Sequence, residues 1–159
     1  MLARPQLTLE RERDVRVVIS LTFGILLAYV AGSLLGTQVV LSNVASMGLD
    51  VTLAMRLSSS LSDLWGLLGT LLPLMAIALL PGWLMLDWIG RRPTMSVAPA
   101  WYVLTGAAGI AILHPALNWV FGVDVFAPAR TMQGLLGQAL AGGLGGVAVA
   151  FSRRGGVGG

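Results

Sequence analysis

The sequence contains no cysteine and no lysine, and charged residues make up only 11% of its 159 residues. Without cysteine, disulfide bonds, thiolate chemistry and cysteine-ligated metal sites are excluded. A soluble domain has about 25% charged residues, whereas here 56% of the residues are hydrophobic and the mean hydropathy is +0.84. This composition excludes a soluble enzyme, a disordered tail and a nucleic-acid-binding module. It predicts an integral protein of the lipid bilayer.

All ten basic residues are arginine, in a chain rich in alanine, glycine, leucine and valine. Such usage is typical of a GC-rich bacterial genome, and we therefore expect a bacterial inner-membrane protein. The arginines occur in short clusters at the ends of apolar blocks, so we interpret them as topological signals rather than as a surface for polyanions.

Four apolar blocks each approach the length of about 20 residues that crosses a hydrocarbon core. We place the spans at about residues 17–37, 64–86, 100–121 and 131–151. The first block is longer than the apolar core of a signal peptide and lacks a clear cleavage site, so we expect it to be retained. The predicted fold is an all-α, antiparallel bundle of four transmembrane helices in a single membrane domain over residues 1–159.

The orientation follows from the arginines, because cytoplasmic loops carry an excess of them. With four spans, Arg56 and Arg130 fall on one side, and the other eight fall on the opposite side: Arg4, Arg11, Arg13, Arg16, Arg91, Arg92, Arg153 and Arg154. Both termini are therefore expected in the cytoplasm. The tryptophans fit two interfacial belts, Trp65 and Trp119 outside and Trp83, Trp88 and Trp101 inside.

The connection over residues 38–62 is moderately apolar, and we expect an interfacial amphipathic helix within it. The apolar residues at helical spacing are Val44, Met47, Val51, Ala54 and Met55. Ser60 followed by Asp63 matches a helix-capping pattern, which predicts that the second span begins there.

Few residues are of the kinds that carry chemistry. Asp87 ends the second span four residues before Arg91, and we expect a local ion pair, with a functional role for Asp87 as the alternative. No ionisable acid or arginine falls at mid-membrane, and no nucleophile with a nearby base, zinc motif or phosphate-binding loop is present. We therefore expect neither an enzyme nor a cofactor or metal site.

His114 is the single histidine and lies in the third span. We expect it to be structural and hydrogen-bonded to Asn118, Gln133 or Gln138. A haem or metal ligand is the alternative, with Met75 as the residue that would complete a His/Met pair.

Several polar side chains fall in the outer halves of the spans: Tyr29, Ser33, Thr70, His114, Asn118, Gln133 and Gln138. They are interpreted either as interhelical hydrogen-bonding groups or as a small binding pocket.

The fourth span has a stripe of small residues, Gly134, Gly137, Ala141, Gly142, Gly145 and Gly146, spaced for close helix packing. It predicts packing within the chain or against a second membrane helix, and leucine is expected to be less disruptive at Gly106 than at Gly142 or Gly145.

Two classes of function follow. The first is a non-enzymatic accessory or assembly subunit that packs against another membrane protein or against its own copies. The second is a small transport or lipid-binding protein that uses the outer polar residues as a pocket.

Overall fold

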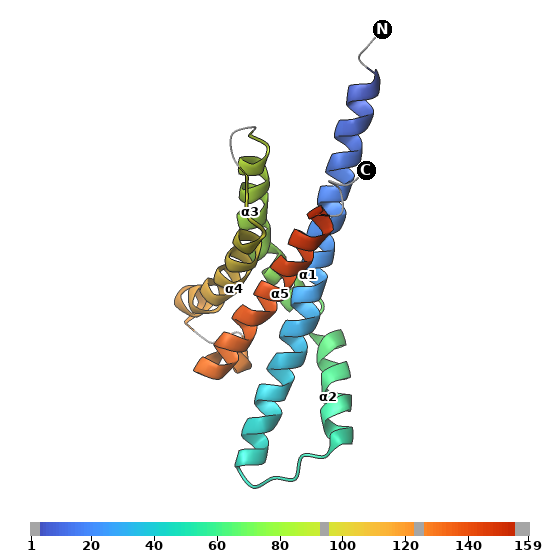
Figure 1. Cartoon of the computed structure of the whole chain (residues 1–159). Helices are drawn as coiled ribbons and strands as arrows, with labels where there is room; N and C mark the ends of the chain where they lie inside the picture. The colour runs from blue at the N-terminus through green and yellow to red at the C-terminus, as the bar shows by residue number, and fades with distance from the viewer. Residues whose placement is uncertain (1–3, 93–95, 123–125, 155–159) are drawn as a thin grey trace.

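The computed structural model describes residues 4–92, 96–122 and 126–154. In these ranges there are five α-helices, one 3-10 helix and no strand. In chain order they are α1 (Arg4–Ser46), α2 (Leu53–Gly66), α3 (Leu71–Gly90), α4 (Pro99–Phe121), η1 (Ala127–Arg130) and α5 (Met132–Arg154). Figure 1 shows that the beginning of α1 and the end of α5 lie toward the same end of the molecule, together with the end of α3.

Four helices are long and apolar enough to cross a membrane, namely the part of α1 over Arg11–Ser46, α3, α4 and α5. The prediction of an all-helical chain with four apolar segments is thus confirmed. The expected third and fourth spans correspond to α4 and α5, whereas the first two need correction.

The first helix is much longer than the span predicted for it. It has 43 residues, or about 65 Å at 1.5 Å per residue, against a hydrocarbon core of about 30 Å. No glycine or proline interrupts residues 38–46, so the helix continues beyond the expected boundary. It ends before Gly48, whose φ of +83° lies in the left-handed region that glycine adopts without strain.

The amphipathic helix exists, but at Leu53–Gly66 rather than over the apolar spacing that begins at Val44. Thr52 is the N-cap of this helix, because its hydroxyl accepts a hydrogen bond from the amide of Met55 at 3.2 Å. The predicted cap at Ser60 is wrong, since Ser60 and Asp63 both lie inside this helix.

The predicted second span is divided. Its first residues belong to the end of α2, a turn follows at residues 67–70, and α3 then runs to Gly90. Pro73 lies in the first turn of α3. Backbone N–H groups in a first turn have no acceptor within their own helix, so a proline there removes no helical hydrogen bond.

The fifth helix lies at the centre of the bundle, between α1 and α4 (Figure 1). A Cβ added at Gly142 would lie 2.3 Å from the carbonyl oxygen of Gly106, and one at Gly145 would lie 2.6 Å from that of Gly24. A Cβ at Gly146 would lie 2.2 Å from the carbonyl oxygen of Tyr102. Since only glycine permits such backbone contact, three residues of the small-residue stripe pack inside this chain.

The other members of the stripe differ from one another. A Cβ at Gly134 would overlap the carbonyl oxygen of Pro128, and Ala141 is completely buried. Gly137 is the loose position, because the nearest atom to its added Cβ is the Leu35 Cβ at 3.9 Å. The stripe therefore brings α5 against α1, α4 and η1.

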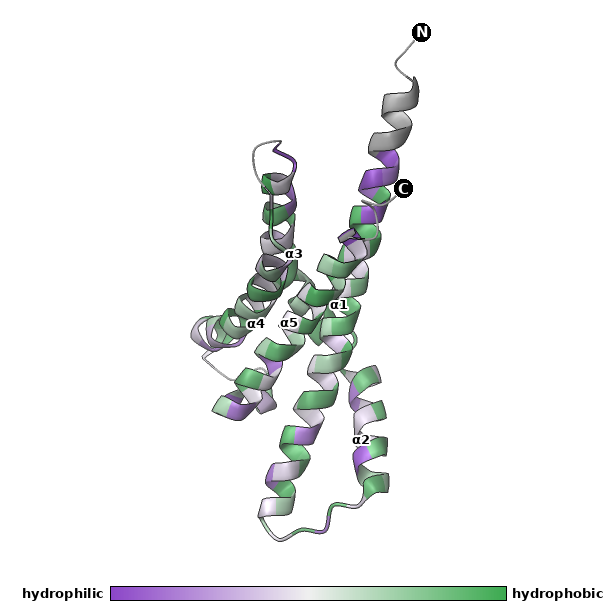
Figure 2. Cartoon of the chain, in the orientation of Figure 1, coloured by the Kyte–Doolittle hydropathy of each residue, from purple (hydrophilic) through white to green (hydrophobic). Residues whose placement is uncertain are grey.

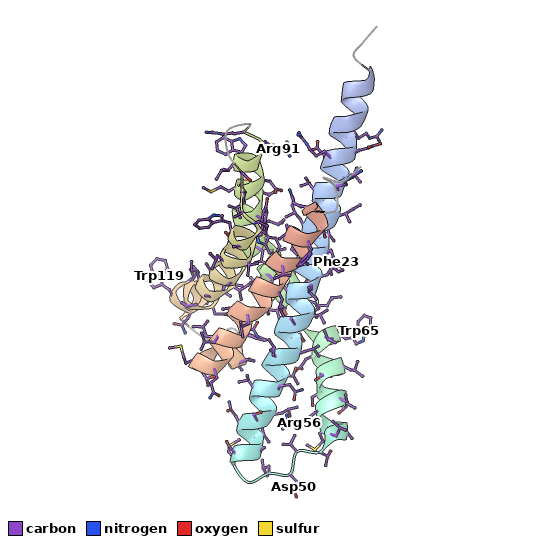
Figure 3. The ribbon with its side chains drawn as sticks, viewed as in Figure 1. Phe23, Asp50, Arg56, Trp65, Arg91 and Trp119 are labelled. Atoms are coloured by element: carbon purple, nitrogen blue, oxygen red, sulfur yellow. The ribbon has the colours of Figure 1, made fainter. Side chains whose placement is uncertain are left out.

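Large apolar side chains cover the outside of the bundle, as expected for a helix bundle surrounded by lipid. Figure 2 shows hydrophilic residues gathered on the N-terminal part of α1 and hydrophobic residues along most of α3 and α4. Trp65 and Trp119 are exposed and point away from the helices (Figure 3). Trp83, predicted to lie at the inner interface, is instead fully buried and donates a hydrogen bond to the carbonyl of Tyr102 at 3.0 Å.

Candidate functional site

A cavity of about 420 Å³ lies between α1, α2 and the segment around η1. Its polar wall consists of Ser33 and Thr37 on α1 with Ser59 and Asp63 on α2. The rest of the wall is mainly apolar and includes Val40, Leu41, Leu67, Phe126 and Pro128. We call this space the α1–α2 cavity.

The polar groups of the α1–α2 cavity are close to one another. The Thr37 hydroxyl oxygen lies 2.6 Å from Oδ2 of Asp63 and 2.9 Å from the carbonyl oxygen of Ser33. Ser33 is completely buried, and its own hydroxyl has no hydrogen-bond partner among the described residues. A buried hydroxyl without a partner is costly, so Ser33 is the least satisfied polar group of this wall.

The polar side of α2 faces α1, not the surroundings. Arg56 donates to the side-chain oxygen of Gln38 at 2.7 Å, and Gln38 donates to the hydroxyl of Ser60 at 3.2 Å. Figure 3 shows Arg56 between the two helices. The exposed side of α2 carries an apolar stripe at four-residue spacing, made of Leu53, Leu57, Leu61 and Trp65. This amphipathic helix is therefore inverted relative to one that packs on a protein core and faces water.

Two of the predicted pocket residues hold helices together. The hydroxyl of Tyr29 donates to the carbonyl of Leu64, which ties the end of α2 to α1. The amide of Gln138 donates to the carbonyl of Gly32 at 2.8 Å and links α5 to α1, while its Oε1 is buried without a partner.

His114 lines a second, smaller cavity of about 280 Å³ with Pro115, Asn118, Phe126 and Arg130. Its ring stacks on Phe126 with a centroid distance of 5.6 Å, and its Nε2 is buried without a hydrogen-bond partner. The predicted hydrogen bonds from Asn118, Gln133 or Gln138 to this nitrogen are therefore absent from the part of the chain that is described.

The seven predicted pocket residues thus do not line a single pocket. Ser33 lines the α1–α2 cavity, and His114 and Asn118 line the second one, with Phe126 on the border of both. Thr70 and Gln133 are exposed. Asp63 was missed as a cavity residue because the sequence pattern assigned it to a helix cap.

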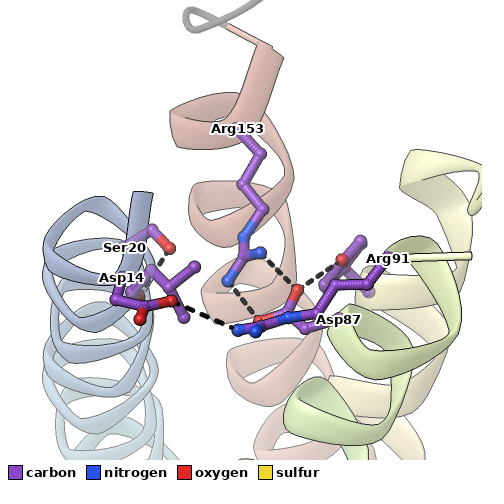
Figure 4. Close-up of polar contacts among 7 residues, drawn as sticks. Asp14, Ser20, Asp87, Arg91 and Arg153 are labelled. Atoms are coloured by element: carbon purple, nitrogen blue, oxygen red, sulfur yellow. Dashed lines mark hydrogen bonds and ion pairs between the residues drawn. The ribbon is translucent and has the colours of Figure 1, made fainter. Parts of the chain in front are cut away.

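A polar cluster that the sequence did not indicate joins three helices near the chain ends (Figure 4). Asp87 on α3 is buried, and both of its carboxylate oxygens contact the guanidinium of Arg153 on α5. The hydroxyl of Tyr102 on α4 donates to the same carboxylate at 2.7 Å. The predicted pair of Asp87 with Arg91 is wrong, because Arg91 instead pairs with Asp14 of α1 at 3.4 Å.

The four long apolar helices, the lipid-type exterior and the glycine-mediated packing are those of a multi-span helical membrane protein. Comparison of the chain with protein-family models, with curated proteins and with solved structures finds no match.

Proposed function

We propose that this protein is a non-enzymatic, multi-span protein of a bacterial inner membrane that binds a small, largely apolar molecule in the α1–α2 cavity. The observation that carries the proposal is the α1–α2 cavity itself, which is large enough for a small ligand and places the Asp63 carboxylate and the Thr37 hydroxyl in a mainly apolar wall. In this proposal four antiparallel spans cross the membrane with both termini in the cytoplasm, which the arginine distribution supports.

The test compares two neighbouring serines on α2. Ser59 lines the cavity, whereas Ser58 is exposed and does not. Wild type, Ser59→Phe and Ser58→Phe are purified from the native membrane in mild detergent, and native mass spectrometry identifies what remains bound. We expect wild type and Ser58→Phe to retain a small molecule that Ser59→Phe has lost. The same retention by all three proteins, or none by wild type, would contradict the proposal.

An accessory or assembly role is the second candidate, and the exposed apolar stripe of α2 favours it. The small-residue stripe of α5 is occupied inside the chain, so a partner helix or a second copy would have to use another surface. The same purification separates the two candidates, because a stoichiometric membrane-protein partner supports the accessory role. Leu57→Glu and Leu61→Glu would then release that partner, and Ser58→Glu would not.

A further inference from the structure

The charge of Asp63 is not balanced by any side chain that the structure describes. The described ion pairs join Arg91 to Asp14 and Arg153 to Asp87, and neither includes Asp63. Arg56, two helical turns before Asp63 on the same face of α2, is held by Gln38 at 2.7 Å. The carboxylate therefore lies in the cavity wall without a cation from the described part of the chain.

The Asp63 carboxylate also has acceptor capacity that the described residues do not fill. Thr37 has one hydroxyl proton but lies within hydrogen-bond distance of two acceptors, the Asp63 carboxylate and the Ser33 carbonyl. A carboxylate can accept several hydrogen bonds. Among the described residues, only Thr37 donates one to the side chain of Asp63. A ligand that fits this wall brings donors and positive charge.

The remaining wall suits an apolar body attached to that charge. Leu41 and Leu67 are aliphatic, and Phe126 presents an aromatic ring that attracts a nearby cation. The volume of about 420 Å³ is much larger than a bare metal ion needs and falls in the range of small-molecule sites.

We propose that the α1–α2 cavity binds an amphiphilic primary ammonium, with its charged nitrogen between the carboxylate of Asp63 and the ring of Phe126 and its carbon chain against Leu41 and Leu67. This inference rests on the proposed function, because it names the chemical class of ligand for the same cavity. Burial of the ammonium beside an otherwise unbalanced carboxylate strengthens their attraction relative to water.

The test uses octylammonium and octanol as probes, which share a carbon chain and differ in charge. Their dissociation constants are measured by calorimetry at neutral pH, with the protein in uncharged maltoside micelles. Asp63→Asn removes the charge in the cavity, and Asp50→Asn removes an exposed charge from the loop between α1 and α2 as a matched control. We expect wild type and Asp50→Asn to bind octylammonium at least about tenfold more tightly than octanol, and Asp63→Asn to lose that difference.

Equal binding of octylammonium by wild type and Asp63→Asn would overturn the inference. If octanol binding is then still abolished by Ser59→Phe, the cavity remains a binding site and only the ligand class is wrong. If neither probe binds wild type, both the cavity function and the ligand class fail. Phe126→Leu provides a second readout should Asp63→Asn fold poorly, since loss of the ring is expected to weaken octylammonium binding alone, and equal weakening of both probes would count against the inference.

Discussion

Asp87 holds three helices together through one carboxylate. Burial of an isolated carboxylate is costly. Here the cost is offset by the bidentate ion pair with Arg153 and by the hydrogen bond from the hydroxyl of Tyr102. The guanidinium of Arg153 also lies 5.6 Å from the centre of the Tyr102 ring. The three side chains therefore act as a clamp at the end of the bundle where the chain termini lie.

Replacement of Asp87 by asparagine is expected to destabilise the bundle by about 3 kcal/mol, because it leaves Arg153 partly buried without its counter-ion. Asp14→Asn is the control, since its pair with Arg91 is exposed and is expected to contribute less than about 1 kcal/mol. Thermal unfolding in detergent measures both. Equal losses of Tm would show that the buried clamp stabilises no more than a surface pair.

His114 is stacked on Phe126 and makes no hydrogen bond through Nε2, so leucine at this position leaves no partner of that nitrogen unpaired. We expect His114→Leu and His114→Gln to change stability by similar amounts, each within about 1 kcal/mol. The measurement is again the Tm in detergent. A much larger loss for leucine would indicate a hydrogen bond to the imidazole, and a Soret band in wild type that glutamine abolishes would indicate haem.

Among the elements, α5 shows most clearly how packing depends on both partners of a contact. Gly142 and Gly106 face each other, and a Cβ at either glycine would lie 2.3 Å from the carbonyl oxygen of the other. The expectation that Gly106 tolerates leucine better than Gly142 is therefore wrong. Small residues were visible in the sequence of α5, but the helix that meets them was not.

Leucine at Gly142 and leucine at Gly106 are expected to be comparably disruptive, each costing about 3 kcal/mol or more, because the two backbones must separate. Gly137→Leu is the matched control on the same helix, since the nearest atom to its added Cβ lies at 3.9 Å. Folded yield and Tm in detergent distinguish the positions. Similar behaviour of Gly137→Leu and Gly142→Leu would contradict the packing described here.

The inverted polarity of α2 comes from side-chain hydrogen bonds to α1 and not from close glycine packing. Arg56 and Ser60 bond to Gln38 of α1, and Asp63 accepts a hydrogen bond from Thr37, so the polar side of α2 faces α1 and its apolar stripe faces outward. In water this arrangement would expose large apolar side chains, whereas lipid or a partner helix accommodates them.

At the scale of the whole molecule, the long α1 and the even number of candidate spans define the topology to be tested. Reporters fused after Arg92 and after Arg154 are expected to be cytoplasmic, and reporters after Asp50 and Arg130 periplasmic, because arginine is concentrated on one side. Alkaline phosphatase and green fluorescent protein fusions measure the two locations. A periplasmic reporter after Arg154 would contradict the proposed topology.

The sequence by itself determined the helical class and the four apolar segments. In a lipid environment backbone polar groups must be satisfied within the segment, so a long apolar run predicts a helix with little help from context. For that reason α4 and α5 lie where hydropathy placed them. The same rule did not locate the end of α1 or the division between α2 and α3, because both occur in moderately polar segments where capping and packing compete.

Only the tertiary structure decided which polar groups meet. Asp87 pairs with Arg153, 66 residues away, rather than with Arg91 on the next turn. Trp83 is buried because α4 offers it the carbonyl of Tyr102, and Asp63 lines a cavity because α2 turns back along α1. These contacts depend on how helices distant in sequence are placed side by side, and neither local spacing nor hydropathy contains that information.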